Sequence, residues 1–212
     1  MWESKVAPLS GVVFAVLLVG SALIANNYDF MPPAEEVAAF YSGDSVRIMT
    51  SAYVGLLSAF ALLWFSGSVY SSLRRIDDDN GRLSLLAFGG GVFASAMVAL
   101  GFLTMMAGAE RAGIVEVIDP GAAAVLFDLS GLVVGTGAAF GLAALIGAWA
   151  VVNLRTEGRM KPIGWAGGLI ALGLISPFSW IVIGLALIWI PAAGVWIYHR
   201  DKTQVGETGA LV

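Results

Sequence analysis

The chain has no cysteine and only one histidine, His199, among its 212 residues. Without cysteine it has no disulfide, thiolate nucleophile, redox pair or cysteine-ligated zinc or iron–sulfur site. A single histidine also excludes a paired-histidine haem and a histidine-rich metal centre within one chain. We therefore expect no metal and no cofactor.

Charged residues are scarce as well. They make up 12% of the chain, against 58% hydrophobic residues, and the mean hydropathy is +0.86. A soluble domain carries about 25% charged residues. Apolar runs of about 18 residues or more recur along the chain, which is typical of transmembrane helices, whereas a β-barrel needs short stretches of alternating polarity. The sequence thus predicts an all-α, polytopic membrane protein. The net charge of −4 and the lack of a basic patch give no indication of nucleic-acid binding.

The apolar runs predict one domain with six transmembrane helices. Their approximate ranges are 6–25, 47–70, 83–108, 121–153, 163–176 and 180–198. A signal peptide is the alternative for the first run, but the run is long for one and no small-x-small cleavage site follows it.

The run 163–198 contains no charged residue and decides the number of crossings. As one helix it would be about 54 Å long, against a hydrocarbon core of about 30 Å. Pro177 would also break such a helix, because proline removes a backbone hydrogen bond and clashes with the preceding turn. We therefore expect two short helices joined at 176–179, with a re-entrant hairpin as the alternative.

The distribution of lysine and arginine sets the predicted orientation, because short cytoplasmic loops are enriched in both. The loops at 26–46 and 109–119 are poor in basic residues, and the other loops and both ends carry most of them. The basic residues on the predicted cytoplasmic side are Lys5, Arg74, Arg75, Arg82, Arg155, Arg159, Lys161, Arg200 and Lys202. Both termini are therefore expected in the cytoplasm, with residues 199–212 as a short polar tail.

Two helix starts are marked by proline. The stretch "PPAEEVAAFY" begins with proline, places Glu35 and Glu36 in the first turn and then becomes apolar. That pattern predicts a short helix at the outer surface. Asp119 followed by Pro120 predicts the start of the fourth span, with a cap before a proline at the first helical position.

Asp128 is the one carboxylate inside an apolar run, "AAAVLFDLSGLVVGTG". An acid within the membrane is costly and indicates a functional site. We hypothesise a polar ligand site formed by Asp128, Ser130 and Thr136. The fourth run is longer than the hydrocarbon core is thick, so an interfacial carboxylate without a special role is the alternative.

Small residues spaced by four predict helix contacts, because helices in lipid associate through close backbone packing. We expect these contacts inside the bundle, with a homodimer seam as the alternative. The predicted packing glycines are Gly131, Gly135, Gly137, Gly141, Gly164 and Gly168.

No catalytic arrangement is visible in the sequence. The helices hold serines and threonines but no intramembrane histidine or lysine, so a hydrolytic triad or dyad is unsupported. The stretch "DDDNG" at 77–81 has the opening spacing of a calcium loop, but Phe88 stands where the closing glutamate belongs. A turn is therefore expected there. These observations favour a non-enzymatic protein.

The layout resembles an uncharacterised family of small six-helix bacterial membrane proteins, a domain of unknown function. The resemblance lies in "PPAEEVAAFYSGDSVR" after the first helix, the basic "LRR" after the second and "LFDLSGL" at the start of the fourth. It extends from about Lys5 to Lys202. It implies a bacterial plasma membrane and a six-helix bundle, but neither an activity nor catalytic residues.

We expect a small integral membrane protein that binds lipid or an apolar solute, or that serves as an accessory membrane subunit. Its expected partners are membrane lipids, a second copy of the chain or another membrane protein. The alternative is a small oligomeric transporter or channel with a polar site near Asp128. A polar cavity that reaches Asp128 would favour the transporter, and a dry interior would favour the first function.

Overall fold

The computed structural model describes residues 6–26, 32–77, 80–115, 118–155 and 161–209, and for 115, 161 and 200–209 it describes the backbone alone. Every regular element in these ranges is a helix, which confirms the all-α class. The elements are η1 (Ala7–Leu9), α2 (Ser10–Ala25), α3 (Ala34–Gly43), α4 (Ser45–Leu73), α5 (Arg82–Val115), α6 (Pro120–Leu132), η2 (Val133–Gly137), α7 (Ala138–Arg155), α8 (Lys161–Ile175) and α9 (Ser179–Gly209).

Within the described ranges, five helices are long and apolar enough to cross a membrane. They are Ala7–Ala25, Ser45–Leu73, Arg82–Ile114, Pro120–Arg155 and Ser179–His199, and the shorter apolar helix Pro162–Ile175 lies between the last two. Large apolar side chains such as Val16, Phe60 and Ile188 are exposed on their outer faces. A lipid environment tolerates such exposure, so the chain is a multi-pass membrane protein by the length and composition of its helices.

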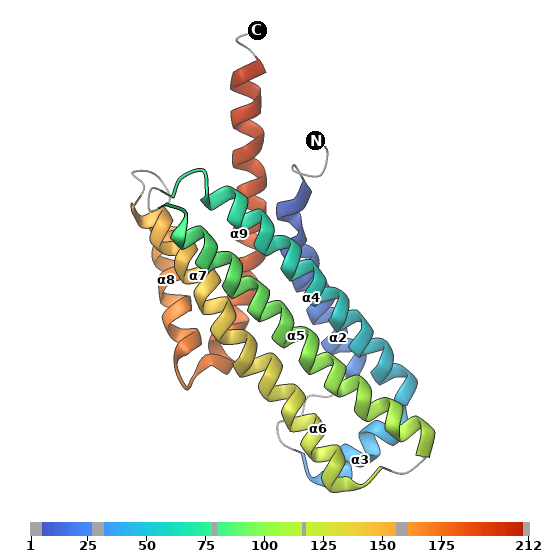
Figure 1. Ribbon diagram of the computed structural model, residues 1–212. Coiled ribbons are helices and arrows are strands. Elements are labelled where there is room, and N and C mark those ends of the chain that lie inside the picture. Colours follow the sequence, from blue (N-terminus) through green and yellow to red (C-terminus); the bar gives the residue numbers. More distant parts are fainter. Residues whose placement is uncertain (1–5, 27–31, 78–79, 116–117, 156–160, 210–212) are drawn as a thin grey trace.

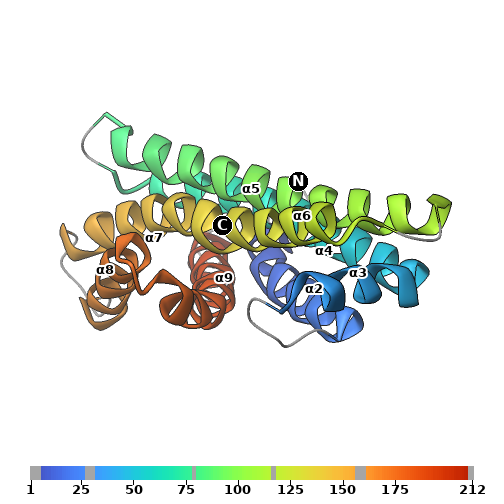
Figure 2. The ribbon, with the colours of Figure 1, turned by 90° about the horizontal axis from the view of Figure 1, so that it is seen from below.

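The long helices form a closed ring. Going round it, α2 packs on α4, α4 on α5, α5 on α7, α7 on α8, α8 on α9, and α9 packs back on α2. Figure 1 shows α4, α5 and the continuous α6–η2–α7 helix side by side, and Figure 2 shows α8, α9 and α2 along their other side. The first and last helices point their free ends to the same end of the bundle (Figure 1).

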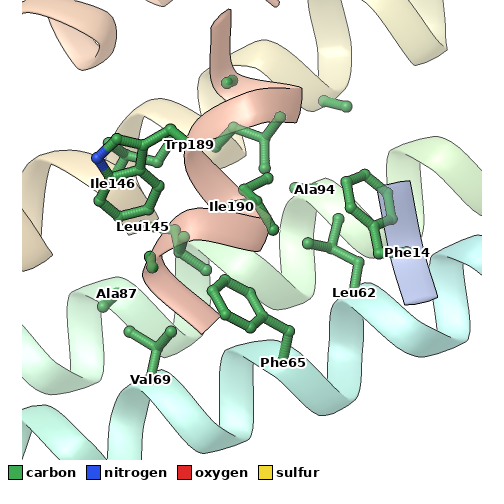
Figure 3. Close-up of a cluster of buried hydrophobic side chains, with 14 of the residues drawn as sticks. Phe14, Leu62, Phe65, Val69, Ala87, Ala94, Leu145, Ile146, Trp189 and Ile190 are labelled. Atoms are coloured by element: carbon green, nitrogen blue, oxygen red, sulfur yellow. The ribbon is translucent and has the colours of Figure 1, made fainter. Parts of the chain in front are cut away.

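The centre of this ring is filled with apolar side chains. Figure 3 shows Phe65 from α4, Leu145 from α7 and Ile190 from α9 pointing toward one another, and all three are fully buried. Trp189, which has no obvious role in the sequence, is 6% exposed. Its ring meets Trp149 edge to face at 4.9 Å between centroids, a favourable aromatic geometry. The described side chains at the centre of the ring are therefore packed against one another in an apolar core.

The short helix predicted at the outer surface is confirmed as a helix. It is α3, which begins after Pro33, has Glu35 and Glu36 in its first turn and lies across one end of α5 and α6. One residue, Asp44, connects it to α4. The Asp44 carboxylate accepts a hydrogen bond of 3.1 Å from the Arg47 backbone N–H and so caps α4.

The fourth long helix starts where the sequence predicts. Pro120 is its first residue, and the Asp119 carboxylate accepts a hydrogen bond of 2.9 Å from the Ala122 backbone N–H. The helix then continues in the same direction, but residues Val133–Gly137 form a π-helical turn between α6 and α7, in which the backbone hydrogen bonds join residues five apart. A π turn inserts one extra residue and rotates the face that follows, and nothing in the sequence predicts it.

The break at Pro177 is also confirmed. Helix α8 ends at Ile175 and α9 begins at Ser179. The Ser176 hydroxyl donates to the Gly173 carbonyl at 2.6 Å and accepts from the Phe178 backbone N–H at 3.2 Å, so the turn supplies its own hydrogen bonds. At its other end the α9 backbone stays helical to Gly209, so helix extends through most of the predicted tail.

Candidate functional site

The predicted polar site lies on α6 and η2. Asp128 is exposed, Ser130 is half-buried and Thr136, within the π turn, is exposed. The hydrophobic core does not include this face of the helix, which also carries the exposed side chains Leu129 and Leu132. Asp128 and Thr136 therefore do not line the interior of the ring. Ser130 lies on the opposite side of the helix from Asp128, and a Cβ built on Gly101 of α5 would be 3.0 Å from the Ser130 carbonyl oxygen.

The level of Asp128 along the bundle follows from the charges on the neighbouring helices. Arg47 and Arg74 bound a charge-free stretch of α4, Arg82 and Glu110 bound one on α5, and Asp128 and Arg155 bound one on α6–α7. Each stretch has about 26 residues, or about 39 Å of helix, which fits a hydrocarbon core of about 30 Å if the helices tilt.

Contacts between the helices align these boundaries. A Cβ built on Gly113 would lie 3.3 Å from the Ser45 hydroxyl oxygen, which sets Glu110 level with the first turn of α4. A Cβ on Gly101 would lie 3.0 Å from the Ser130 carbonyl oxygen, which sets Asp128 one to two turns nearer the bundle centre. This geometry favours the interfacial interpretation of Asp128, because the carboxylate lies near the end of an apolar stretch and not at its middle.

Polar side chains inside the bundle are bonded to the helices themselves. The Ser66 hydroxyl donates to the Leu62 carbonyl and the Ser95 hydroxyl to the Gly91 carbonyl, both at 2.8 Å, and the Asn153 amide donates to the Trp149 carbonyl at 2.8 Å. Among the described residues, the buried polar side chains are serines and one asparagine, with no charged group. Such local bonds satisfy the hydroxyls without creating a polar path.

Two serines, one in α2 and one in α4, exchange hydrogen bonds between these long helices. The Ser21 hydroxyl lies 2.8 Å from the Ser51 carbonyl, the Ser51 hydroxyl lies 2.8 Å from the Ser21 carbonyl, and both residues are fully buried. Interhelical hydrogen bonds of this kind fix the pairing of helices in lipid. The sequence does not predict this pair, because its two members are 30 positions apart and become neighbours only through the packing of α2 on α4.

The predicted packing glycines fall into two groups. A Cβ on Gly141 would lie 2.6 Å from the Gly90 carbonyl oxygen, one on Gly137 would lie 3.1 Å from the Met97 sulfur and one on Gly164 would lie 3.0 Å from Leu154. These three glycines sit at helix contacts. Beside Gly131, Gly135 and Gly168 there is open space within 4 Å.

Tyr41 lies in a second, smaller cluster of buried side chains at the α3 end of the bundle. It is fully buried between α3 and α5, and its hydroxyl has no hydrogen-bond partner among the described residues. Burial raises the pKa of Tyr41 from 10.0 to about 12, because a tyrosinate would lose its hydration there. The sequence predicts the helix but not this buried hydroxyl.

Among the described residues, no group of three or more acidic or histidine side chains is placed to hold a metal ion. Comparison of the chain with protein-family models, curated proteins and solved structures gives no match. The resemblance to an uncharacterised family of bacterial membrane proteins therefore stays a prediction.

Proposed function

We propose that the chain is a non-enzymatic integral membrane protein of the bacterial plasma membrane that binds membrane lipid on its outer surface. The observation that carries this proposal is the apolar, closed centre of the helix ring, where the described buried side chains include no charged group. A transporter or channel needs polar groups along its path. A membrane enzyme needs an acid, base or nucleophile in a pocket.

The placement of Asp128 also bears on the alternative function. A transporter with a site at Asp128 would use that carboxylate inside the bundle, whereas the side chain is exposed on the outer face of α6. The exposed Val125, Leu129 and Leu132 surround it on the same helix. This surface suits contact with lipid, with the carboxylate at headgroup level.

Six crossings with both termini in the cytoplasm are part of the proposal. A Cβ built on Gly11 would lie 3.1 Å from the Ile190 carbonyl oxygen, and one built on Gly194 would meet the Pro8 carbonyl oxygen. These two contacts show that α2 and α9 run antiparallel and set their register. At equal rise per residue, Ser179 at the start of α9 is level with the last turn of α2. The turn between α8 and α9 therefore lies at the same depth in the bundle as the end of α2. This supports a hairpin of α8 and α9 that crosses the whole membrane.

Helix α8 is the shortest of the six, with 15 residues. It spans about 22 Å, less than the usual core of about 30 Å. A short helix is accommodated when the bilayer thins locally and flanking basic side chains extend to the interface, and Lys161 stands at the start of α8. The excess of lysine and arginine on one side supports the orientation.

Native mass spectrometry of the chain released directly from its own membrane tests the function. We expect phospholipid to remain bound and to be the principal ligand. In parallel, vesicles containing the chain should be no leakier to protons and small ions than empty vesicles. A leak that the Asp128→Asn variant abolishes would overturn the proposal in favour of a transporter or channel. The Glu36→Gln variant, which removes an exposed carboxylate from α3, is the matched control.

A further inference from the structure

Helix α3 is held to the rest of the molecule by few side chains. It packs on α5 and α6 at one end of the bundle (Figure 1). Of its ten residues, Val37 and Tyr41 are buried and the others are exposed or half-buried. A helix of this length is marginal in water on its own, so α3 depends on these contacts for its structure.

The contacts of α3 belong to a hydrophobic cluster of their own. The buried residues of this α3 cluster are Val37, Tyr41, Ile48, Ala109, Ala112, Ile118 and Ala123, and none of them is part of the main core around Phe65 and Leu145. Phe40 adds an edge-to-face contact with Phe127 of α6, with 6.2 Å between the ring centroids. Because the two clusters are separate, α3 can come away without disrupting the packing of the long helices.

The connection from α3 to α4 is suited to act as a hinge. It consists of one residue, Asp44, whose φ of −155° and ψ of 66° lie outside the α-helical region. Asp44 Oδ2 and Arg47 Nε form an ion pair at 3.3 Å, but both side chains are partly exposed, so the pair adds little stability. The Asp44 carboxylate caps α4 and not α3. A change of backbone angles at this residue therefore moves α3 and leaves α4 intact.

The docked position of α3 has an unfavourable feature at Tyr41. The Tyr41 hydroxyl is buried and has no hydrogen-bond partner among the described residues. An unpaired donor away from water is unfavourable, and water can reach this hydroxyl once α3 lifts. The ring fits only because Gly108 of α5 has no side chain, since a Cβ there would lie 2.7 Å from Tyr41 Cζ. Docking of α3 therefore buries apolar surface but also one unpaired polar group.

We propose that α3 is a hinged lid, which turns about Asp44 and opens over the ends of α5 and α6 while the long helices stay assembled. In the closed position Tyr41 covers Gly108 of α5 and Phe40 covers Phe127 of α6. Opening uncovers this apolar surface at the end of the bundle. The lid is independent of the proposed lipid binding and adds a conformational change to the molecule.

The labelling rate of one cysteine on the buried side of α3, Val37→Cys, tests the lid. The full-length chain, which has no cysteine of its own, is labelled in lipid vesicles with excess N-ethylmaleimide, a reagent that crosses membranes. Val37→Cys should react more slowly than the exposed Glu36→Cys. It should react at least about tenfold faster than Ala59→Cys, which lies in the main core and becomes accessible only when the bundle opens.

Two further changes should shift the lid in opposite directions. Added to Val37→Cys, Gly108→Ala should raise the labelling rate about tenfold or more, because the new methyl group displaces the Tyr41 ring. Tyr41→Phe should lower the rate about twofold to fivefold, because closing no longer buries an unpaired hydroxyl. Gly89→Ala is the matched control, since it lies on the same helix with open space beside it and should leave the rate unchanged.

Amide hydrogen exchange of residues 34–43, measured without the cysteine, is a second readout that does not require a substitution at Val37. Exchange there should be faster than in α5, and Gly108→Ala and Tyr41→Phe should again act in opposite directions. The lid is overturned if α3 exchanges and is labelled only as fast as the main core. Equal effects of Gly108→Ala and Gly89→Ala would also overturn it.

Discussion

At the scale of single residues, Tyr41 is a polar group that folding removes from water without giving it a partner among the described residues. Its pKa is raised to about 12 by burial, above the ordinary value of 10.0. The neutral form is therefore favoured in the folded state, and stability is lost as the pH rises from about 10 through about 12, because the unfolded chain ionises first. Below about pH 10 this contribution is fully present.

The Tyr41→Phe variant tests this account. The difference in absorbance near 295 nm between the natural chain and the variant, followed against pH, should show one group with a midpoint near 12. The variant should also be as stable as the natural chain or more stable by up to about 1 kcal/mol at pH 7, because it removes a buried hydroxyl without a partner. A midpoint near 10 in the difference titration would mean that the hydroxyl reaches water.

The residue types in the sequence predict only some of the polar features of the structure. The sequence singles out Asp128 because a carboxylate interrupts an apolar run, yet its exposure depends on which face of α6 the neighbouring helices cover. A polar pocket of about 370 Å³ between α4 and α5, lined by Arg74, Asp77, Asn80 and Gly81, is not predicted by the sequence, where "DDDNG" indicates only a turn. Asn80 and Gly81 do have the positive φ values of 52° and 77° that suit a turn, and Asp78 and Asp79 lie outside the described residues.

At the scale of elements, α5 and α7 can cross closely because glycines, Gly90 and Gly141, stand at the point of contact. A Cβ on Gly141 would lie 2.5 Å from the Ala94 backbone nitrogen and 2.6 Å from the Gly90 carbonyl oxygen, and backbone atoms cannot move aside as a flexible side chain does. We expect Gly141→Ala to lower the free energy of unfolding by about 1–3 kcal/mol.

Gly131→Ala provides the control for that crossing, because it lies on the same long helix with open space beside it. There alanine should be neutral or stabilising by up to about 1 kcal/mol through its helix propensity. Denaturation in mixed micelles, followed by circular dichroism, measures both variants. Equal effects at the two positions would show that the helices do not cross at Gly141.

The Ser21 and Ser51 hydroxyl oxygens lie 3.1 Å apart, within hydrogen-bond distance, and this side-chain contact provides a test of the pairing of α2 with α4. In a double-mutant cycle with Ser21→Ala and Ser51→Ala, the coupling energy should be about 0.6–1.7 kcal/mol, the range found for interhelical hydrogen bonds in membranes. The same cycle with Ser21→Ala and Ser68→Ala, an exposed serine bonded within α4, should show no coupling. Coupling at or below the control value would contradict the pairing.

The sequence predicted the positions of the helices better than it predicted any other feature of the structure. Apolar runs and prolines locate the helices, because length, hydropathy and helix-breaking are local properties. Helix bounds differ from the predicted ones where a helix extends beyond the apolar run, as α5 does to Val115. The π turn at Val133–Gly137 was not predictable, since it arises from the fit of α6–α7 against its neighbours.

At the scale of the whole molecule, the described helices form a closed ring whose centre is filled with apolar side chains. Helix order round the ring depends on contacts between distant segments, such as Gly194 of α9 against the Pro8 carbonyl oxygen. A hydropathy pattern contains no such information, so the sequence predicts the class of the protein and not its arrangement. We infer the side of the membrane on which each turn lies from the basic residues, and this orientation is the central claim.

The most direct measurement uses the lack of cysteine in the chain. Single cysteines at Glu36→Cys in α3, Phe178→Cys in the turn before α9 and Thr203→Cys after the last apolar segment are labelled in intact cells with a membrane-impermeant thiol reagent. Glu36→Cys and Phe178→Cys should react, and Thr203→Cys should react only after the cells are opened. Reaction of Thr203→Cys in intact cells would contradict the six crossings. Reaction of Phe178→Cys only in opened cells would show that the last hairpin does not cross.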